Sequence, residues 1–462
     1  MNFFQHPKTL WILCFSQAWD TFSYYGTQTI LVLYFIHNFQ LNQHDSYLLY
    51  GAYAAFTYSM PTVGGIIADK WLGSQKTLLL GGILNIVGNL CLLSFDRYLF
   101  SLGLATALIG SGLFKSNATH LVGTLYPDRD IRKESGFTWS YLSVNVGGTL
   151  GPLVYGLVVY AWGWQYGFLC SAVGIAISLT CFIKTWHYWV PTVKPSLLLT
   201  SFICSAIIIA CFLMSLPFYY PAIINSLILS LFSLAVLYLV INGMKYHGDE
   251  RRHLLALLTL SFFGMFYYAA GMQVGSSLVL FIQSKVQGHI IHMALPASTI
   301  SMLYPFFVLA LAPFFMWLWP TLANKNILLK TPTKLAIGIF LATLGIVMFA
   351  LAAYTNWILL GVIVGILLLS AGEITLAPAL YTAVSDLAPA KIKITIMGGY
   401  LLFLAFGSYL SSILALSSQW VAEKITVATP PFFLQFALIA AFTFIVFLIL
   451  LFINKRLSKM MR

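Results

Sequence analysis

Charged side chains are scarce in this sequence: Asp, Glu, Lys and Arg together make up only 8% of its 462 residues. In an average soluble domain about a quarter of the residues are charged. Hydrophobic residues account for 60% of the chain instead. The composition therefore excludes an ordinary soluble protein and predicts an integral membrane protein whose main partner is the lipid bilayer.

Motifs for enzymatic chemistry and metal binding are also missing. The six cysteines form no CxxC pair and lie in or beside apolar stretches, which indicates core residues rather than disulfides or metal ligands. The nine histidines show no HExxH spacing, and neither a G-x-S-x-G elbow nor a Walker loop occurs. We therefore expect no enzyme, no metal and no cofactor.

Apolar segments long enough to cross a bilayer of about 30 Å recur along the whole chain. They are too long and too continuously apolar to be strands of a membrane barrel. An all-α protein with fourteen membrane-spanning helices is therefore expected, at residues 9–36, 47–67, 77–95, 99–122, 136–160, 166–185, 197–217, 221–242, 254–282, 297–321, 333–353, 357–384, 394–416 and 430–453.

The basic residues predict the orientation of these helices. If the N-terminus is cytoplasmic, every Lys and Arg falls on the cytoplasmic side except Arg97, Lys285 and Lys424 outside and Lys115 within a span. This distribution satisfies the positive-inside rule and predicts that both termini are cytoplasmic. The net charge of +12 is thus a signal of topology, and no nucleic-acid partner is expected because no basic cluster is interleaved with aromatic residues.

The spans fall into two groups of six around a central pair. The helices at 197–217 and 221–242 carry no charged residue, so they can face lipid on every side. Six helices before this hairpin and six after it match the plan of a major facilitator transporter, whose site lies between the halves. We expect an N-terminal bundle over 1–185, a linker with the hairpin over 186–253, and a C-terminal bundle over 254–462.

A polar stripe runs along the first predicted helix. A carboxylate is costly in hydrocarbon, so this face is expected to turn toward the protein interior or an aqueous cavity. Two interpretations are open: the wall of a substrate path, or a polar seam for helix packing. The stripe follows the 3.6-residue period of a helix and consists of Gln17, Asp20, Thr21, Tyr24 and Gln28.

Two further charged residues, Lys115 and Glu373, lie well inside spans. Asp20 and Lys115 belong to the same half and are expected to pair, either as a fixed salt bridge or as part of a switch or ligand site. Glu373 has no cation in its own half, so it is either protonated or meets a cation of the substrate. A positive charge at Lys115 and a negative charge at Glu373 suit a zwitterionic ligand.

The segment GGIIADKWLGSQK, residues 64–76, follows the second span. Its G-x-x-x-D-[KR]-x-x-G pattern is typical of major facilitators at this position. Glycines permit close helix packing, and Asp69 and Lys70 are candidates for an inter-helix pair that locks the cytoplasmic side. The alternative is an ordinary charged turn.

Several segments resemble the proton-dependent oligopeptide transporter family. QAWDTFSYYG (17–26) resembles its helix 1 motif E-x-x-E-R-F-x-Y-Y-G, and the segment beginning GLFKSN at 112 resembles its G-L-F-K-P-N segment. FTWSYLSVNVGG (137–148) resembles its F-x-x-x-Y-x-x-I-N-x-G signature, and further matching segments follow in order through the second half. The resemblance implies a bacterial inner-membrane carrier that imports di- or tripeptides with protons by alternating access.

The resemblance also implies roles for matching positions. Lys115 would attract the substrate carboxylate, Glu373 would hold its ammonium group, and Asn145 would hydrogen-bond the peptide. Tyr304 and Tyr400 stand where the family has a helix 8 asparagine and a helix 11 tryptophan, and both are included in the candidate site. The remaining residues expected to line the site are Tyr24, Tyr25, Tyr58, Gln273 and Ser277.

Other positions depart from the family pattern. Gln17 replaces the first glutamate of the helix 1 motif, Asp20 replaces the second, and Thr21 replaces the arginine. Met272 replaces the helix 7 glutamate. Because the lost carboxylates are tied to proton coupling, Asp20 and Glu373 are the remaining candidates for the proton site. The alternative function is a family relative that carries another small polar metabolite or amino-acid derivative, with altered coupling or none. The protein is expected to be a monomer.

Overall fold

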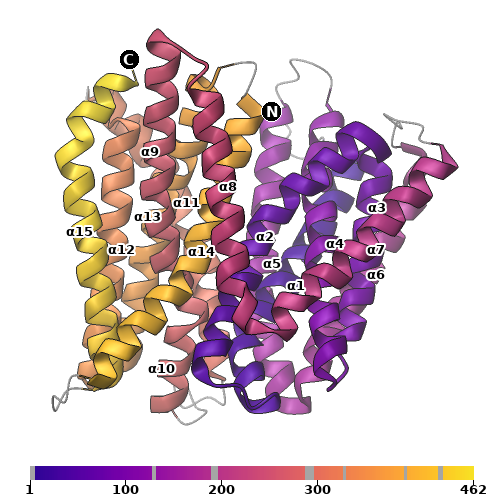
Figure 1. Cartoon of the computed structure of the whole chain (residues 1–462), viewed down its shortest axis with the longest axis horizontal. Helices are drawn as coiled ribbons and strands as arrows, with labels where there is room; N and C mark the ends of the chain where they lie inside the picture. Colours follow the sequence, from indigo (N-terminus) through magenta and orange to yellow (C-terminus); the bar gives the residue numbers. More distant parts are fainter. Residues whose placement is uncertain are drawn as a thin grey trace. The chain divides into compact units, whose positions relative to one another are not determined.

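The computed structural model describes residues 6–126, 132–188, 196–286, 296–325, 329–389, 393–424 and 430–461. Over these ranges the chain is helical and contains no strand, which confirms the predicted all-α fold (Figure 1). The first half of the chain consists of six helices and the first helix of the central hairpin, α7. They are α1 (Lys8–Asn38), α2 (Gln43–Ile67), α3 (Ser74–Cys91), α4 (Arg97–Thr124), α5 (Arg132–Trp162), α6 (Trp164–Lys184) and α7 (Leu197–Tyr219).

The second half begins with the other hairpin helix. Its helices are α8 (Ile224–Gly243), α9 (Gly248–Gly271), α10 (Ser277–Val286), α11 (Leu303–Asn324), α12 (Thr331–Tyr354), α13 (Ile358–Leu387), α14 (Lys393–Lys424) and α15 (Pro431–Met460). Each of the fourteen predicted spans coincides with a helical segment, and the span at 254–282 consists of two helices, α9 and α10. A 3₁₀ turn at Met272–Gly275 separates them.

Eleven helical stretches within the described ranges are long and apolar enough to cross a membrane. The first three helices are not among them, although α1 with 31 residues, α2 with 25 and α3 with 18 are long enough to span. Their polar content explains this: α1 carries the stripe that includes Asp20, and α3 contains Asn85 and Asn89. Helices whose polar side chains are buried by neighbouring helices can span a membrane with lower mean hydropathy.

The chain forms two compact units. Unit 1 comprises Met1–Leu49, Phe56–Ile224 and Met293–Met302. Unit 2 comprises Tyr50–Ala55, Asn225–His292 and Leu303–Arg462. The central hairpin is therefore divided, with α7 in unit 1 and α8 in unit 2, while the limits of the domains expected from the sequence remain a prediction.

Glycines bring the helices of unit 1 into close contact. A Cβ atom at Gly147 of α5 would lie 2.1 Å from the carbonyl oxygen of Ala18 on α1, and one at Gly88 of α3 would lie 2.4 Å from the backbone nitrogen of Ala107 on α4. Small residues at such crossings let two membrane helices approach backbone to backbone. This packing sets α1 against α5 and α3 against α4, and so positions the polar residues of α1 and α3.

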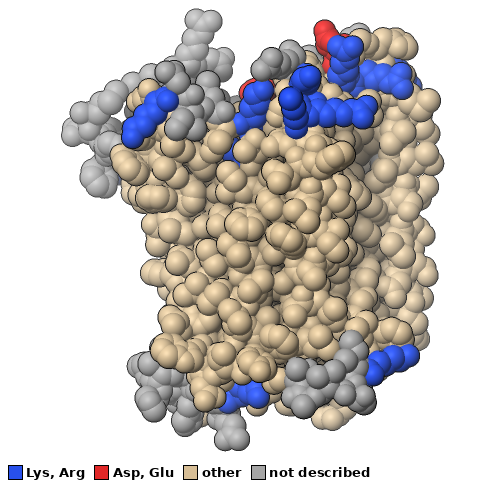
Figure 2. Space-filling view, turned by 90° about the vertical axis from the view of Figure 1, so that its left-hand side faces the viewer, with Lys and Arg blue, Asp and Glu red and all other residues tan. Residues whose placement is uncertain are grey.

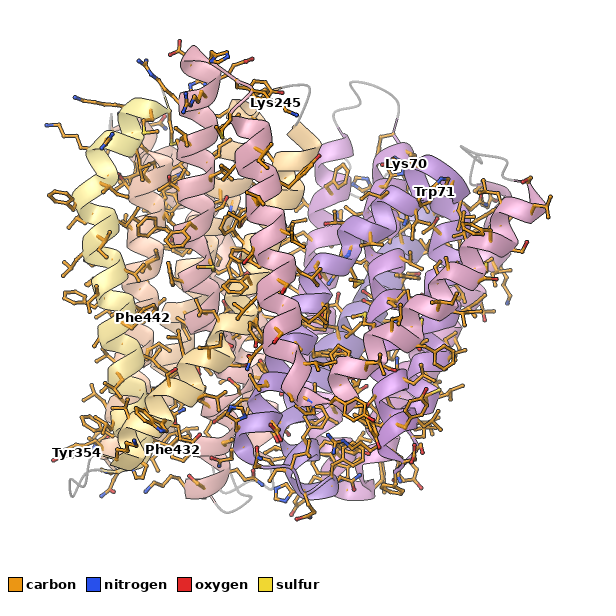
Figure 3. All side chains as sticks on the ribbon, viewed as in Figure 1. Lys70, Trp71, Lys245, Tyr354, Phe432 and Phe442 are labelled. Carbon is orange, nitrogen blue, oxygen red and sulfur yellow. The ribbon has the colours of Figure 1, made fainter. Side chains whose placement is uncertain are left out.

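Unit 2 uses the same device. A Cβ atom at Gly407 of α14 would lie 2.4 Å from the carbonyl oxygen of Met265 on α9, and one at Gly338 of α12 would lie 3.0 Å from the carbonyl oxygen of Gly372 on α13. Lys245 lies at one end of unit 2, whereas Tyr354 and Phe432 lie at the opposite end (Figure 3). The helices of this unit thus run from one end of it to the other.

Each helix of the hairpin packs on its own unit. On α7, Ile203 and Ile207 join a buried cluster with Leu113 of α4. On α8, the ring of Phe232 stacks on Phe406 of α14 at 3.9 Å. The outward faces carry exposed apolar side chains such as Leu198, which is 84% exposed, as expected for helices that face lipid.

Charged side chains are confined to the margins of the surface that Figure 2 displays. On that face, Lys, Arg, Asp and Glu lie near two opposite edges, and a broad uncharged band separates them. A band of this kind matches the hydrocarbon core of a bilayer, in which charged groups are costly. The surface therefore agrees with a membrane-spanning fold.

Candidate functional site

The polar stripe of α1 faces the protein interior, as the sequence predicts. Gln17, Asp20, Thr21, Tyr24 and Gln28 are all buried, and Asp20 is only 2% exposed. The side chain of Gln17 illustrates how the polar groups of the stripe form hydrogen bonds with neighbouring helices. Its Oε1 accepts a hydrogen bond from the hydroxyl of Ser140 on α5, and its Nε2 donates to Thr119 on α4 at 3.3 Å.

Asp20 is held by an asparagine of α3. The Nδ2 of Asn85 donates to Oδ1 of Asp20 at 3.1 Å, and Nδ2 of Asn89 donates in turn to Oδ1 of Asn85 at 2.7 Å. Within the described residues, Oδ2 of Asp20 is buried without a hydrogen-bond partner. A buried carboxyl oxygen without a donor is costly when it is charged.

The two asparagines are functional candidates that the sequence analysis missed. They lie four residues apart in an otherwise apolar helix, which places both on one face. The same argument that identifies the stripe of α1 would have found them. Uncharged amides attract less attention than a carboxylate, although a buried amide also requires partners.

The expected ion pair between Asp20 and Lys115 is not formed. Among the described residues, no ion pair joins these two side chains, and Asp20 is bonded to Asn85 instead. The Lys115 ammonium lies 5.5 Å from the centroid of the Tyr24 ring, in the geometry of a cation–π contact. Lys115 is half-buried, and its role in binding stays a prediction.

The other site candidates of unit 1 are distributed over three helices. The rings of Tyr24 and Tyr25 lie 4.8 Å apart on α1, edge to face. Tyr58 on α2 and Asn145 on α5 are half-buried, and Nδ2 of Asn145 donates to the carbonyl of Tyr141 within its own helix at 3.0 Å. Their contribution to substrate binding stays a prediction.

Glu373 lies on α13 among tyrosines of unit 2. The hydroxyl of Tyr304 on α11 is within hydrogen-bonding reach of its carboxyl group. Tyr304 also contacts the hydroxyl of Tyr267 on α9 at 3.2 Å, and Tyr267 donates to the carbonyl of Leu369. Tyr400 of α14 is near enough for the charge of Glu373 to act on it. Glu373 itself is half-buried and has no ion-pair partner in the described part of the chain.

Gln273 and Ser277 are completely buried at the break between α9 and α10. Ser277 donates to Oε1 of Gln273 at 2.7 Å, and Nε2 of Gln273 donates to the carbonyl of Ser411 on α14 at 2.8 Å. Gln435 of α15 donates to the Ser277 hydroxyl at 3.3 Å. These bonds fasten the break to α14 and α15, and a place for either residue in the substrate site remains a prediction.

The glycine-rich segment after α2 forms a π-helical turn, η1 (Ala68–Leu72). Gly73 follows it with a φ of 76°, a conformation that favours glycine. Asp69 and Lys70 are exposed at this turn, and neither forms an ion pair with another described residue. Their proposed part in gating is therefore not tested by this structure.

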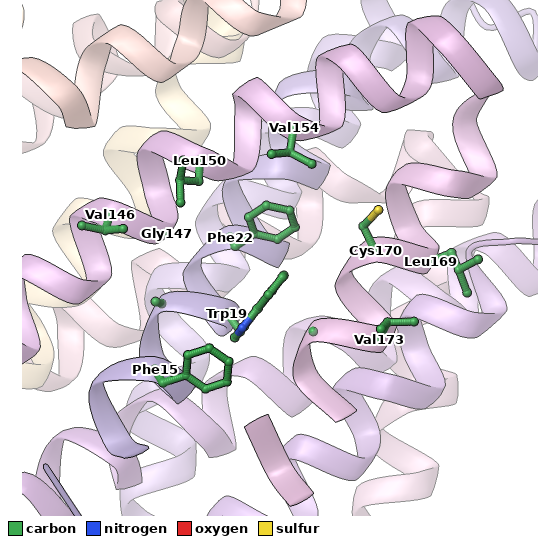
Figure 4. Close-up of a pocket in the computed structure, with 12 residues that line it drawn as sticks. Phe15, Trp19, Phe22, Val146, Gly147, Leu150, Val154, Leu169, Cys170 and Val173 are labelled. Carbon is green, nitrogen blue, oxygen red and sulfur yellow. The ribbon is translucent and has the colours of Figure 1, made fainter. Parts of the chain in front are cut away.

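An apolar cavity of about 590 Å³ lies elsewhere in unit 1, between α1, α5 and α6 (Figure 4). Its only polar side-chain atoms belong to Trp19 and Cys170, and Phe15, Phe22 and Leu150 are among its other walls. A peptide needs partners for its charged ends and amides. This cavity supplies none for the charged ends, so it is not a candidate for the transport site.

The sequence profile of the POT family matches residues 75–430 of the chain. The chain belongs to the POT family. It is therefore a transporter rather than an enzyme, and a multi-pass protein of the inner membrane.

Among curated proteins, the chain is similar to Peptide transporter YePEPT of Yersinia enterocolitica, with 27% identity over 86% of this chain and 85% of the relative. It is also 27% identical to Dipeptide and tripeptide permease A of Serratia proteamaculans, over 90% of this chain and 84% of the permease.

Solved structures of POT transporters share the fold. A POT family transporter in complex with 5-aminolevulinic acid superposes with a TM-score of 0.84 at 24% identity, over 99% of this chain and 98% of the other. One in complex with a thioalcohol-conjugated peptide also gives a TM-score of 0.84 at 24% identity, over 98% of each chain. These likenesses establish the major facilitator fold of two helical bundles with a central hairpin.

Proposed function

We propose that this protein imports di- or tripeptides, or peptide-like zwitterions, by alternating access and in symport with protons. The observation that carries the proposal is the burial of two charged side chains without a neutralising partner among the described residues. Lys115 in unit 1 and Glu373 in unit 2 are half-buried within spans, and no ion pair to a described residue neutralises either. Charged groups in a membrane normally have a partner, and the substrate is the partner that the described part of the chain does not supply.

Lys115 provides the binding group for the substrate carboxylate. Its ammonium is a compact charge with three donors, and it lies over the face of the Tyr24 ring. A carboxylate arriving beside it would form a charge-assisted hydrogen bond, which is about twice as strong as a neutral one. The bond forms without breaking a prior salt bridge.

Glu373 provides the binding group for the ammonium end of the substrate. Tyrosine hydroxyls and rings surround its carboxyl group, and Tyr304 is placed to donate to it. An ammonium group among aromatic rings and a carboxylate gains both cation–π and ionic attraction. Names of relatives support this ligand class, since two of the curated proteins are a peptide transporter and a dipeptide and tripeptide permease.

Proton coupling is assigned to Asp20, with Glu373 as the second candidate. Asp20 is the carboxyl group that remains in the altered motif of α1, and it lies near Lys115 without pairing to it. We infer that both termini are cytoplasmic, that the protein acts as a monomer, and that Asp69 and Lys70 contribute to closing the cytoplasmic side.

Uptake by purified protein in liposomes tests the proposal. With the lumen more alkaline than the medium, radiolabelled dialanine is expected to accumulate above its external concentration, and a protonophore is expected to abolish the accumulation. Liposomes without protein provide the control. If dialanine, trialanine and 5-aminolevulinic acid all fail to enter or to compete, the proposed substrate class is wrong.

A small amino-acid-derived zwitterion is the second candidate substrate. It is favoured by the tyrosines at 304 and 400, which place two hydroxyl-bearing rings near Glu373. A solved POT transporter binds 5-aminolevulinic acid, which has one ammonium and one carboxylate. Competition by 5-aminolevulinic acid at concentrations at which dialanine does not compete would favour this candidate.

A further inference from the structure

We propose that Asn85 and Asn89 of α3 are positioning residues of the proton site at Asp20. In this site Asn85 fixes a donor on Oδ1 of the carboxyl group, Asn89 fixes the orientation of Asn85, and Oδ2 is the oxygen that takes and releases the proton. The proposal rests on the proposed function only in assigning Asp20 to coupling, and the geometry that supports it lies wholly within unit 1.

The hydrogen bonds form a directed chain from Asn89 through Asn85 to Asp20. Nδ2 of Asn89 donates to Oδ1 of Asn85 at 2.7 Å, and Nδ2 of Asn85 donates to Oδ1 of Asp20 at 3.1 Å. Ser23 bonds to Asn89 in both directions: its hydroxyl accepts from Nδ2 at 3.3 Å and donates to Oδ1 at 3.5 Å. All four side chains are at most 5% exposed. In such a chain each bond polarises the next, so the bonds support one another.

The donor count fixes the orientation of the Asn85 amide. Because Oδ1 of Asn85 already accepts from Asn89, its NH₂ group is the part that faces Asp20. If the amide were reversed, its oxygen would face the carboxyl group of Asp20 and its NH₂ would face that of Asn89. Asn89 therefore prevents an arrangement that would repel an ionised Asp20.

Only one oxygen of Asp20 receives this support. Oδ2 is buried with no hydrogen-bond partner among the described residues. The Ser111 hydroxyl of α4 lies near enough to act on the carboxyl group. Protonation at Oδ2 removes the charge from the unsupported oxygen and leaves the Asn85 bond intact. On deprotonation the O–H bond at Oδ2 breaks, its electron pair stays on the oxygen as the carboxylate, and a water molecule that reaches Oδ2 during the transport cycle takes the proton.

Lys115 of α4 is the one described charge that acts on Asp20. On α3 and α6, the charged residues lie far along the helix from the residues that contact α1. Lys76 of α3 is nine positions before Asn85, which is about 13 Å along the helix. Gly174 of α6 contacts α1, and Lys184 follows ten positions later.

The titratable groups nearest to this region are uncharged side chains. Tyr24 follows Asp20 by one turn on α1. Tyr155 of α5 bonds to Thr27, two turns beyond Asp20, and to Ser171 of α6. The charged side chains of α5 precede Gly147, its contact with Ala18, by at least 13 positions. The proton equilibrium of Asp20 is thus set by Lys115, by burial and by the asparagine chain.

Infrared difference spectroscopy of the purified full-length protein tests this role without any substrate. The protonated-carboxyl band that Asp20→Asn removes is assigned to Asp20 and followed against pH. Asn85→Leu removes a donor from the ionised form, so the carboxyl group should keep its proton to higher pH. The midpoint is expected to rise by about one to two pH units, since a hydrogen bond to a charged group contributes about 1.5–3 kcal/mol.

Asn89→Leu and Asn117→Leu separate positioning from packing. Asn89→Leu touches no atom of Asp20, yet it frees the Asn85 amide to reverse, so a smaller rise in the same direction is expected. Asn117 is an equally buried asparagine of α4 that donates to the carbonyls of Gly64 and Leu113, and its substitution should leave the midpoint unchanged.

Two outcomes would overturn the proposal. One is an unchanged midpoint in Asn85→Leu, or in Asn89→Leu if the former does not fold. The other is a spectrum in which Asp20→Asn removes no pH-dependent carboxyl band. Failure of the wild-type protein to take up peptides would instead refute the proposed function, and would leave the spectroscopic result standing.

Discussion

At the scale of the residue, burial and partners divide the polar side chains into two groups. Gln17, Gln273 and Ser277 are buried and bond to other protein groups, which is the pattern of residues that hold helices together. Lys115 and Glu373 are half-buried charges without an ion pair to a described residue. The second pattern is that of groups kept available for a ligand.

Sequence reasoning located these residues more reliably than it assigned their partners. The inward-facing stripe of α1 follows from its period and from the cost of a carboxylate in lipid, and the structure confirms it. The partner of Asp20 does not follow, because opposite charge favours Lys115 whereas packing of α3 brings Asn85 to the carboxyl group. Distances between helices are not encoded in the spacing along one of them.

The single substitution Asp20→Asn is expected to uncouple substrate transport from proton transport. The amide has nearly the shape of the carboxyl group but cannot exchange a proton at neutral pH, so substrate exchange should continue while accumulation stops. Counterflow and pH-gradient-driven accumulation are measured separately in liposomes. If accumulation persists at the wild-type level, Asp20 is structural, and coupling either runs through Glu373 or does not use protons.

At the scale of the element, the helices can be predicted from the length of the hydrophobic segments, whereas the interruptions within them cannot. Each predicted span is helical, yet the predicted helix 254–282 is interrupted at Met272–Gly275. Gly271 precedes the interruption and Gly275 ends it, but isolated glycines also occur inside continuous helices of this chain, such as Gly174. The break is fastened by the bond from Gln273 to the carbonyl of Ser411 on α14, a contact between distant helices that no local pattern reveals.

Close helix contacts predict large effects of small substitutions. Gly147→Ala should lower the unfolding temperature of the protein in detergent and reduce its yield, because its Cβ atom would lie 2.1 Å from the carbonyl oxygen of Ala18. Overpacking of this kind costs about 1–3 kcal/mol or more. Gly65→Ala is the matched control, since no atom lies within 4 Å of the added Cβ. Equal melting temperatures for the two variants would contradict the packing described for α1 and α5.

At the scale of the whole molecule, the orientation in the membrane is predicted by charge. Lys245 and Tyr354 lie at opposite ends of unit 2 (Figure 3). The positive-inside rule assigns the end with Lys245 to the cytoplasm. Alternation of the helices then assigns Tyr354 to the outside.

Cysteine labelling tests this orientation. In a variant whose six native cysteines are replaced by serine, Tyr354→Cys should react with a membrane-impermeant maleimide in intact cells. Lys245→Cys should react only after the membrane is opened. The reverse labelling pattern would show that the termini lie outside the cytoplasm.

The central claim is that Lys115 binds the carboxylate of the substrate and Glu373 binds its ammonium. A chemical double-mutant cycle tests it most directly. Three ligands are compared as competitors of dialanine counterflow: dialanine, its carboxyl amide and its des-amino analogue. Each is measured with the wild-type protein, with Lys115→Ala and with Glu373→Gln. A variant without measurable counterflow is assayed instead by binding of the same three ligands to purified protein.

We expect a loss of affinity of about 10- to 100-fold for each single change, from the energy of one charge-assisted bond. Lys115→Ala should cause no further loss for the carboxyl amide, and Glu373→Gln none for the des-amino analogue, because each pair shares one interaction. Fully additive losses in both pairs would contradict the claim.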